Sequence, residues 1–193
     1  MEKKRCEWAN GKNPEMVRYH DNEWGVPAFD DRVLFEFLVL EGAQAGLSWE
    51  TILNKRKGYR KVFSGFSPEK IAKFSNAKLD SILGVPDIVR NRAKVYSVRV
   101  NARAFLRVQK EYGSFSKYFW NFTRGKALQH SFRSSKEIPS ETPLSQEISK
   151  DLKIRGFTFV GPTICYAFMQ AVGMVNDHET GCFRYTQARE ERK

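Results

Sequence analysis

The sequence predicts an all-α fold. Three observations point to it: apolar residues recur at helical intervals along most of the chain, capping residues precede the apolar segments, and strands do not alternate with helices. The sequence shows no internal repeat and no low-complexity segment. The longest irregular stretch is Thr123 to Pro143, which is rich in Ser, Arg and Lys.

The first half of the chain contains four predicted helical starts. Asp31 to Leu40 is strongly apolar behind two aspartates, which is typical of a buried helix with a capped start. Ser48 to Phe63 places apolar residues on one side and basic residues on the other, which favours a half-buried helix. Ser67-Pro68-Glu69 combines a hydroxyl cap with proline at the first helical position. Asn76 is expected to cap a short helix that ends at Leu83.

The second half of the chain begins with a tight turn at Gly84 to Asp87. A long helix is expected from about Asp87 to Tyr112, because apolar residues recur there every three or four positions. Three further helices are predicted by the same periodicity, at Ser114 to Phe122, at Leu144 to Arg155 before Gly156, and at Pro162 to Val172.

Composition favours one globular domain, residues 1–186, followed by a charged, disordered tail, residues 187–193. The net charge of +11 favours a polyanionic partner such as nucleic acid, although a basic surface that only keeps the protein soluble would have the same balance. No apolar run reaches the roughly 18 residues that span a bilayer. An odd number of cysteines without a secretory signal points to the cytoplasm.

Two cysteines and two histidines stand near opposite ends of the chain: Cys6 and His20, and His178 and Cys182. The spacing of the second pair places both side chains on one face of a helical turn or a tight loop. Two thiolates with two imidazoles form the ligand set of a tetrahedral structural zinc site, which would join the termini. The alternative is that these are unrelated core and surface residues.

The turn at Gly84 and the helix that follows it form a possible grip on a DNA backbone. Amides at a helix start can donate to a phosphate, and Arg90, Arg92 and Lys94 would surround that point. The usual hairpin of this kind has a second glycine where this chain has Pro86. The alternative is a turn with no role beyond turning.

Aromatic residues and one carboxylate gather in the first quarter of the sequence. Trp8, Trp24, Trp49 and Tyr19 fall there, and so does Glu41, which directly follows the apolar run that ends at Leu40. A carboxylate in that position is either paired or functional, and aromatic faces beside it would suit a flat cationic ring. The alternative is that the aromatic residues are core and Glu41 is a solvated helix end.

Three motifs resemble one known family. YHDNEWG from Tyr19, LEGAQAGLSW from Leu40 and GFTFVGPTICYAFMQAVGMVNDH from Gly156 look like the bacterial 3-methyladenine DNA glycosylase I family. The resemblance runs from Cys6 to Cys182. It implies a helix-hairpin-helix glycosylase fold in which a structural zinc, held by Cys6, His20, His178 and Cys182, joins the two terminal segments.

The resemblance also implies roles for the pocket residues. Glu41 matches the carboxylate that hydrogen-bonds the alkylated adenine, and Tyr19 and Trp49 match the aromatic residues that face the base, with Trp8 and Trp24 completing the wall. Leu47, after Gly46, is the candidate for the wedge that enters the DNA stack. Similar proteins often carry a tyrosine where this chain has Met16, which makes that wall less polar.

The expected function is therefore hydrolysis of the N-glycosidic bond of 3-methyladenine in double-stranded DNA. A monomer would flip the base out of the duplex and leave an abasic site without strand cleavage. The rival interpretation is a non-catalytic, zinc-stapled DNA-binding module. A small-molecule hydrolase is disfavoured because no nucleophile and base form a set: Cys165 is expected to be packing and His130 to be solvated.

Overall fold

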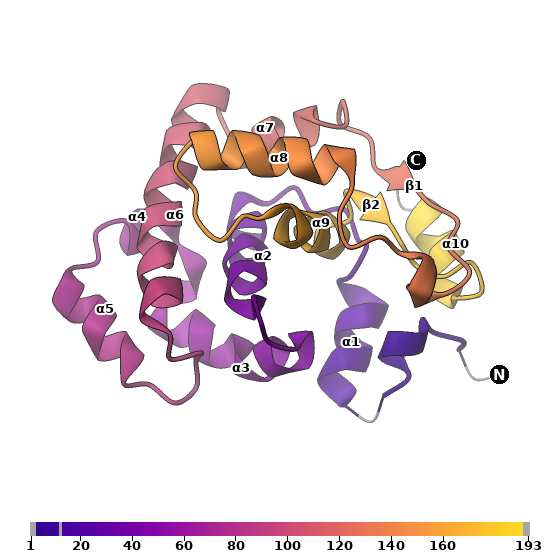
Figure 1. The fold of residues 1–193 in the computed structure, drawn as a ribbon, viewed down its shortest axis with the longest axis horizontal. Helices are drawn as coiled ribbons and strands as arrows, with labels where there is room; N and C mark the ends of the chain where they lie inside the picture. The colour runs from indigo at the N-terminus through magenta and orange to yellow at the C-terminus, as the bar shows by residue number, and fades with distance from the viewer. Residues whose placement is uncertain (1–2, 12, 191–193) are drawn as a thin grey trace.

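The computed structural model describes residues 3–11 and 13–190 of the 193-residue chain. Helices α2 and α9 lie in the middle of the molecule, the long helix α6 stands at one side, and both ends of the chain lie at the opposite side (Figure 1). The described elements are α1 (Pro14–Asn22), α2 (Asp31–Gln44), α3 (Trp49–Val62), α4 (Pro68–Ile71), α5 (Asn76–Leu83), α6 (Arg92–Tyr112), α7 (Phe115–Asn121), β1 (Leu128–Gln129), α8 (Pro143–Ile154), α9 (Pro162–Ala171), β2 (Val175–Asn176) and α10 (Phe183–Glu190), with short 3-10 turns at Glu7–Ala9, Ser64–Phe66 and Ser135–Glu137.

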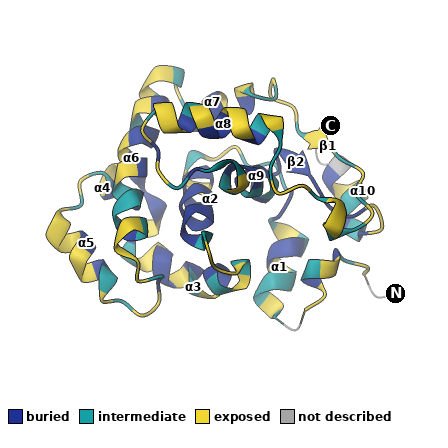
Figure 2. Ribbon diagram, viewed as in Figure 1, coloured by how far each residue is buried: buried dark blue, intermediate teal, exposed yellow. Residues whose placement is uncertain are grey.

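Helix α2 forms the centre of the core. Its start is capped by Asp30, whose side chain accepts hydrogen bonds from the amides of Arg32 and Val33. Every residue from Leu34 to Ala43 is buried, because α3, α6, α7 and α9 surround the helix (Figure 2). A charged side chain in this segment is therefore removed from water and needs either a partner or a ligand.

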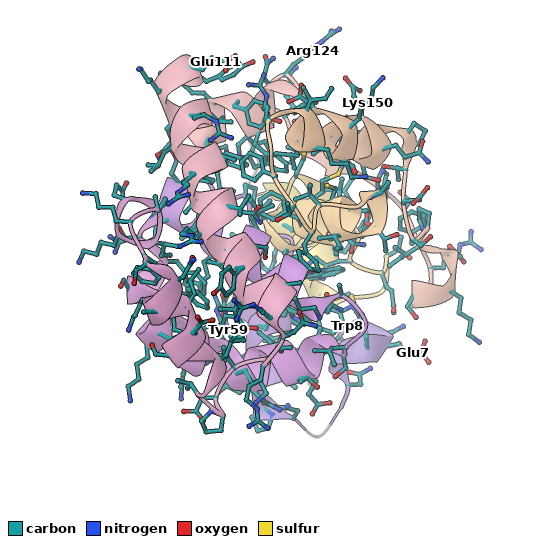
Figure 3. The ribbon with its side chains drawn as sticks, turned by 60° about the vertical axis from the view of Figure 1, so that its left-hand side comes forward. Glu7, Trp8, Tyr59, Glu111, Arg124 and Lys150 are labelled. Atoms are coloured by element: carbon teal, nitrogen blue, oxygen red, sulfur yellow. The ribbon has the colours of Figure 1, made fainter. Side chains whose placement is uncertain are left out.

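The turn between α5 and α6 is clamped onto α3. Gly58 makes the close approach possible, since a β-carbon there would lie 2.3 Å from the carbonyl oxygen of Asp87. Lys55 donates a hydrogen bond to the carbonyl of Pro86, and the hydroxyl of Tyr59 (Figure 3) accepts one from the amide of Val89. Because α3 begins at Trp49, one helix connects this turn with the aromatic residues at its other end.

Two predicted helix starts need correction. The long helix begins at Arg92 rather than near Asp87, because the segment after Asp87 is held against α3 and Asn91 supplies the cap, accepting from the amide of Lys94. The short helix before it is capped by Ser75, whose hydroxyl accepts from the amide of Lys78, so that Asn76 is its first helical residue.

Three regular features were not predicted. Helix α1 is capped by Asn13 with Pro14 at its first position, the same kind of start signal as Ser67-Pro68. Strand β1 lies inside the irregular stretch, and strand β2 lies just before His178. The two strands form one short parallel pair, and the fold remains all-α in class. Helix α10 runs through residues 187–190, where a disordered tail was expected, and Ala188 there is fully buried. Residues 191–193 lie outside the described residues.

The two ends of the described chain are held together. The amide of Phe183 at the start of α10 donates to the carbonyl of Lys4 over 2.9 Å, and the amide of Glu7 donates to the carboxylate of Glu179. Among the described helices, none combines the length and the apolar character that crossing a bilayer requires.

Candidate functional site

A cavity of about 350 Å³ opens between the N-terminal segment, α1, α2, α3 and α9. This volume lies within the range of pockets that enclose small ligands. Its walls contain all five pocket residues that the sequence singled out, namely Trp8, Tyr19, Trp24, Glu41 and Trp49. Met16, the departure from the family pattern, lies in the same wall. Residues from these five segments therefore meet around one space.

Among the described residues, Glu41 is the one acidic side chain in the wall of this cavity. Its side chain is 4% exposed and forms no hydrogen bond or ion pair with the described residues. Burial raises the pKa of this carboxyl group to about 8. Glu36, buried on the same helix, differs in that Arg56 and Arg60 donate to its Oε1. The fold thus neutralises one buried carboxylate of α2 and leaves the other facing the cavity.

Aromatic rings surround the carboxyl group. Tyr19 lies 5.3 Å from Trp49 between ring centroids, and Trp8 meets Trp24 edge to face at 5.0 Å. Trp8 lies among the N-terminal segments of the molecule (Figure 3). Burial and the charge of Glu41 raise the pKa of the Tyr19 hydroxyl well above its ordinary value, so that this side chain stays neutral. Indole and phenol faces beside one carboxyl group favour a flat ring that carries positive charge.

The loop between α2 and α3 projects an apolar side chain at the edge of the cavity. Gly46 adopts a φ of +76°, a left-handed conformation that favours glycine, and Leu47 after it is 42% exposed. A second hollow of about 200 Å³ lies between this loop and the start of α9, and Glu41 lines both spaces. Leu47 is therefore placed to contact a molecule that reaches into the cavity.

The three cations expected at the hairpin have different surroundings. Arg90 is exposed and forms no ion pair within the described part of the chain. Arg92 is exposed but pairs with Asp80 over 2.6 Å and donates to the hydroxyl of Tyr96. Lys94 is not a free phosphate contact, because its ammonium group donates to the carbonyls of Ala43 at 2.9 Å and Ala45 at 2.5 Å.

Lys94 instead connects the hairpin with the cavity. The carbonyl groups of the last turn of a helix have no partners within the helix, and Lys94 satisfies two of them at the end of α2. This end carries Glu41, and the loop with Leu47 follows directly. Hydrogen bonds from Lys94 therefore connect the start of α6 directly with the end of α2 that lines the cavity.

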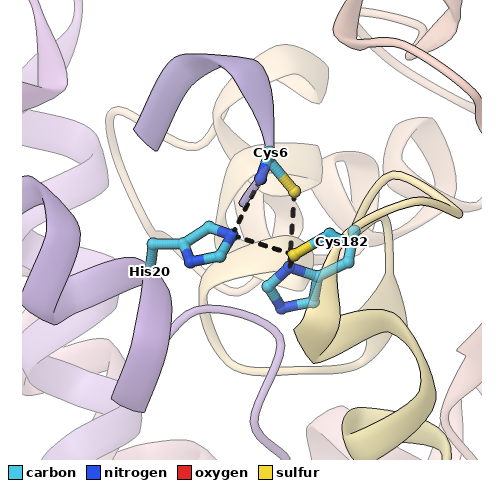
Figure 4. A group of neighbouring side chains, drawn as sticks. Cys6, His20 and Cys182 are labelled. Atoms are coloured by element: carbon cyan, nitrogen blue, oxygen red, sulfur yellow. Dashed lines mark hydrogen bonds between the residues drawn. The ribbon is translucent and has the colours of Figure 1, made fainter. Parts of the chain in front are cut away.

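Four potential metal ligands converge at the joined termini. Cys6, His20, His178 and Cys182 are buried, and their ligand atoms all lie within 4.8 Å of one another. Figure 4 shows the side chains of Cys6, His20 and Cys182 gathered around one point. The Sγ atom of Cys182 is 3.4 Å from Nε2 of His20 and 3.7 Å from Nδ1 of His178. Tetrahedral zinc, with bonds of about 2.0–2.3 Å, separates such ligand atoms by roughly 3.3–3.8 Å. The residues present fit a metal ion.

The far side of each imidazole is also hydrogen-bonded. Nδ1 of His20 is 2.8 Å from the carboxylate of Asp21, which Arg5 holds in turn, and Nε2 of His178 is 3.1 Å from the carbonyl of Trp24. These partners take up the N–H of each ring and leave the other nitrogen facing the cluster as a ligand. Hydrogen bonds from Cys6 and from the two histidines lower the pKa of the Cys182 thiol, while the hydrogen bond to Cys182 raises the pKa of Cys6, so Cys182 is the sulfur that ionises first.

The cluster of four potential ligands lies directly behind the wall of the cavity. Trp8 follows Cys6 by two residues and packs edge to face on His20, with 5.2 Å between centroids. Trp24 packs on His178 in the same manner at 4.6 Å. The Cys/His cluster and two walls of the cavity are therefore in direct contact.

Several residues of the cavity wall were not predicted from the sequence. Gln44 and Gln170 line the cavity from α2 and α9, and Ile138 reaches it from the long irregular stretch. Neutral amides carry no spacing signal, and a loop that folds back over a site is not visible from local patterns. Cys165 is buried in α9, as expected for packing. His130 was expected to be solvated but is half-buried against Asp177, 2.6 Å away.

These features together define a class. An all-α protein with a clamped hairpin, a projecting apolar side chain and a base-sized aromatic cavity around one unpaired carboxyl group is a helix-hairpin-helix protein of the DNA glycosylase type. Comparison with known proteins gives the particular family. The methyladenine glycosylase family model matches residues 8–185.

Relatives in sequence and structure agree with this assignment. The DNA-3-methyladenine glycosylase of Haemophilus influenzae is 43% identical over 178 residues, covering 92% of this chain and 96% of its own. DNA-3-methyladenine glycosylase 1 of Escherichia coli is 44% identical over 181 residues, covering 94% and 96%. The structure of 3-methyladenine DNA glycosylase I from Staphylococcus aureus superposes with a TM-score of 0.89 at 35% identity, covering 93% and 95%. The chain belongs to the methyladenine glycosylase family, which confirms the fold and the family predicted from the motifs.

Proposed function

We propose that this protein excises 3-methyladenine from alkylated double-stranded DNA by hydrolysing the N-glycosidic bond. The observation that carries the proposal is Glu41, a buried carboxyl group without a partner in a cavity of about 350 Å³. A protein that only bound DNA would gain nothing from such a cavity, because an unpartnered buried acid costs stability. Family membership adds the reaction, since the curated relatives are named DNA-3-methyladenine glycosylases.

The cavity favours an alkylated base over a normal one by charge. Methylation at N3 of adenine in DNA gives the ring a positive charge, which the faces of Trp8, Trp49 and Tyr19 attract and which favours the ionised form of Glu41 once the base is bound. Neutral adenine gains little from the same groups. A related 3-methyladenine DNA glycosylase I has been solved in complex with 3-methyladenine, with a TM-score of 0.90 to this chain at 35% identity.

A base within the duplex cannot reach the cavity, so it must leave the stack. Extrusion costs a few kcal/mol, and Leu47 would offset part of this cost by filling the gap in the helix. Arg90 and the turn held on α3 would contact the backbone phosphates beside the extruded nucleotide. Lys94 and Arg92 serve this geometry indirectly, through their contacts with the end of α2 and with Asp80.

The chemistry needs little acid–base assistance. The oxygen of a water molecule forms a bond to C1′ of the sugar, and the C1′–N9 bond breaks. The bonding pair goes to the base and neutralises its positive charge, while the proton of the attacking water is lost to solvent. Glu41 holds and orients the cationic base during this exchange. No lysine among the described residues lines the cavity, so no Schiff base forms and the product is an abasic site in an intact strand.

The cluster of Cys6, His20, His178 and Cys182 suits zinc, because two thiolates and two imidazoles complete a tetrahedral shell with no open position. Its role would be structural: it joins the termini and fixes Trp8 and Trp24. None of the three cysteines forms a disulfide bond within the described residues, which fits a reducing compartment, and we place the enzyme in the cytoplasm as a monomer that acts on duplex DNA.

The proposal is tested by incubating the protein with DNA treated with a methylating agent and separating the released bases by chromatography. We expect free 3-methyladenine and no strand breaks on a denaturing gel. Glu147→Gln, which changes an exposed acid on α8, serves as the matched control for Glu41→Gln and should keep full activity. Retention of methylated bases in the DNA by the native protein would contradict the proposal.

A further inference from the structure

A buried hydrogen-bond network lies behind the wall that α9 contributes to the cavity. Asp177 is 1% exposed, and its Oδ2 atom accepts from the Tyr166 hydroxyl at 2.6 Å and from the Gln170 amide nitrogen at 2.8 Å. Its Oδ1 atom is 2.6 Å from Nδ1 of His130. All three partners come from segments outside α2, which carries Glu41. Among the described residues of this network, Gln170 alone lines the cavity.

Gln170 belongs both to this network and to the cavity wall. The terminal amide of glutamine has one donating side, the NH₂ group, and one accepting side, Oε1. A carboxylate can only accept, so Gln170 must turn its NH₂ group toward Asp177. Rotating the amide would set Oε1 against the Oδ2 atom that the Tyr166 hydroxyl already occupies, with two acceptors facing each other. The acceptor Oε1 therefore lies on the side of the amide away from Asp177, and Gln170 itself lines the cavity.

We propose that Asp177 locks the amide of Gln170 so that Oε1 acts, together with Glu41, as an acceptor for the 6-amino group of the extruded base. This inference rests on the function proposed above and concerns which purine that site accepts. In a 3-methyladenine nucleotide, the only N–H donors of the base are the two hydrogens of its 6-amino group. Glu41 on α2 and Gln170 on α9 supply one acceptor each from two sides of the cavity.

The lock predicts selectivity at position 6 of the purine. A 6-oxo purine such as 3-methylhypoxanthine has nearly the same shape but carries an acceptor where 3-methyladenine carries a donor. Against a fixed Oε1 that oxygen finds no partner, and an unpaired buried polar group disfavours binding. Gln170 is thus a specificity-determining residue, and Asp177 is a positioning residue that acts through it.

The test measures binding of free 3-methyladenine and free 3-methylhypoxanthine through quenching of tryptophan fluorescence, in the native protein and three variants. In Gln170→Met the acceptor is lost at nearly constant length, so affinity for 3-methyladenine should fall by about tenfold, with less change for the 6-oxo base. In Asp177→Asn the amide can turn, so the 6-oxo base should gain roughly tenfold relative to 3-methyladenine, as the fraction of receptive protein rises.

Tyr166→Phe is the matched control, because it removes one donor to Asp177 but keeps the carboxylate and should leave the ratio of the two affinities unchanged. Metal content and melting temperature are recorded for every variant, since Asp177 precedes His178. Equal weakening of both ligands in Gln170→Met and an unchanged ratio in Asp177→Asn would overturn the inference. If Asp177→Asn does not fold, the ratio of the two ligand affinities in Gln170→Met decides the test alone: an unchanged ratio overturns the inference. Failure of the native protein to release 3-methyladenine from DNA would instead reject the proposed function.

Discussion

Replacing Glu41 by glutamine should make the folded protein more stable at neutral pH while removing most of its excision activity. The carboxyl group is buried without a partner, and burial raises its pKa from the ordinary 4.5 to about 8. Glutamine has almost the same shape and no charge at any pH. The substitution therefore removes the cost of holding an acid in the cavity without changing the packing around α2.

The magnitude follows from proton linkage. Between pH 4.5 and about 8 the unfolded chain releases the proton of this carboxyl group and the folded chain keeps it. The unfolded state then binds fewer protons, so the free energy of unfolding falls as pH rises through this window and levels off above it. At pH 7, which is two and a half pH units above the ordinary pKa of 4.5, the native protein has lost on the order of 3 kcal/mol of its free energy of unfolding through this group. The free energy of unfolding of Glu41→Gln does not fall in this way, because glutamine does not titrate.

The assay is urea denaturation of the native protein and of Glu41→Gln at pH 5, 7 and 8.5. We expect the two curves to lie close together at pH 5 and to separate progressively toward pH 8.5, with the variant more stable. Comparing the two proteins at each pH cancels the titration of all other groups, including the metal ligands. A variant that is less stable than the native protein, or a difference that does not change with pH, would refute the reasoning.

Three further outcomes are expected. Cys182→Ala should lose its zinc, measured by metal analysis, and melt roughly 10 °C lower, since a loss of about 3 kcal/mol shifts a chain of this length by that amount; unchanged melting would show that the cluster is not structural. Leu47→Gly should excise about tenfold more slowly from duplex DNA but normally from single strands, where no gap needs filling; equal slowing on both would exclude a wedge. Lys94→Met should slow excision and leave unchanged the slope of the logarithm of DNA affinity against the logarithm of salt concentration. Arg90→Ala should reduce the magnitude of that slope by about one. A reduced slope for Lys94→Met would show that Lys94 contacts a phosphate.

Much of the candidate site could be predicted from the sequence, because its residues are either rare in this chain or differ in character from their neighbours. Only three cysteines and three histidines occur in the chain, so two of each near opposite termini already suggest one cluster. Glu41 stands out because an acid at the end of an apolar run contradicts its surroundings. Helical periodicity placed the core helices for the same reason: burial selects one face of a helix and leaves a visible pattern.

Features that depend on long-range packing could not be seen in the same way. Lys94 lies in a basic cluster, and nothing local shows that its partners are the carbonyls of Ala43 and Ala45. The start of α6 shifts to Arg92 because the preceding turn packs on Gly58, a contact between distant segments. The end of α10 becomes helical because Ala188 is buried. The orientation of Gln170 depends on Asp177 from another segment.

The measurement that tests the central claim most directly is a crystal structure of the protein soaked with 3-methyladenine. The base should lie in the cavity between the rings of Trp8 and Trp49, with the carboxyl group of Glu41 within hydrogen-bonding distance of its edge. Density for the base elsewhere, or a base in the cavity with Glu41 turned away from it, would contradict the account.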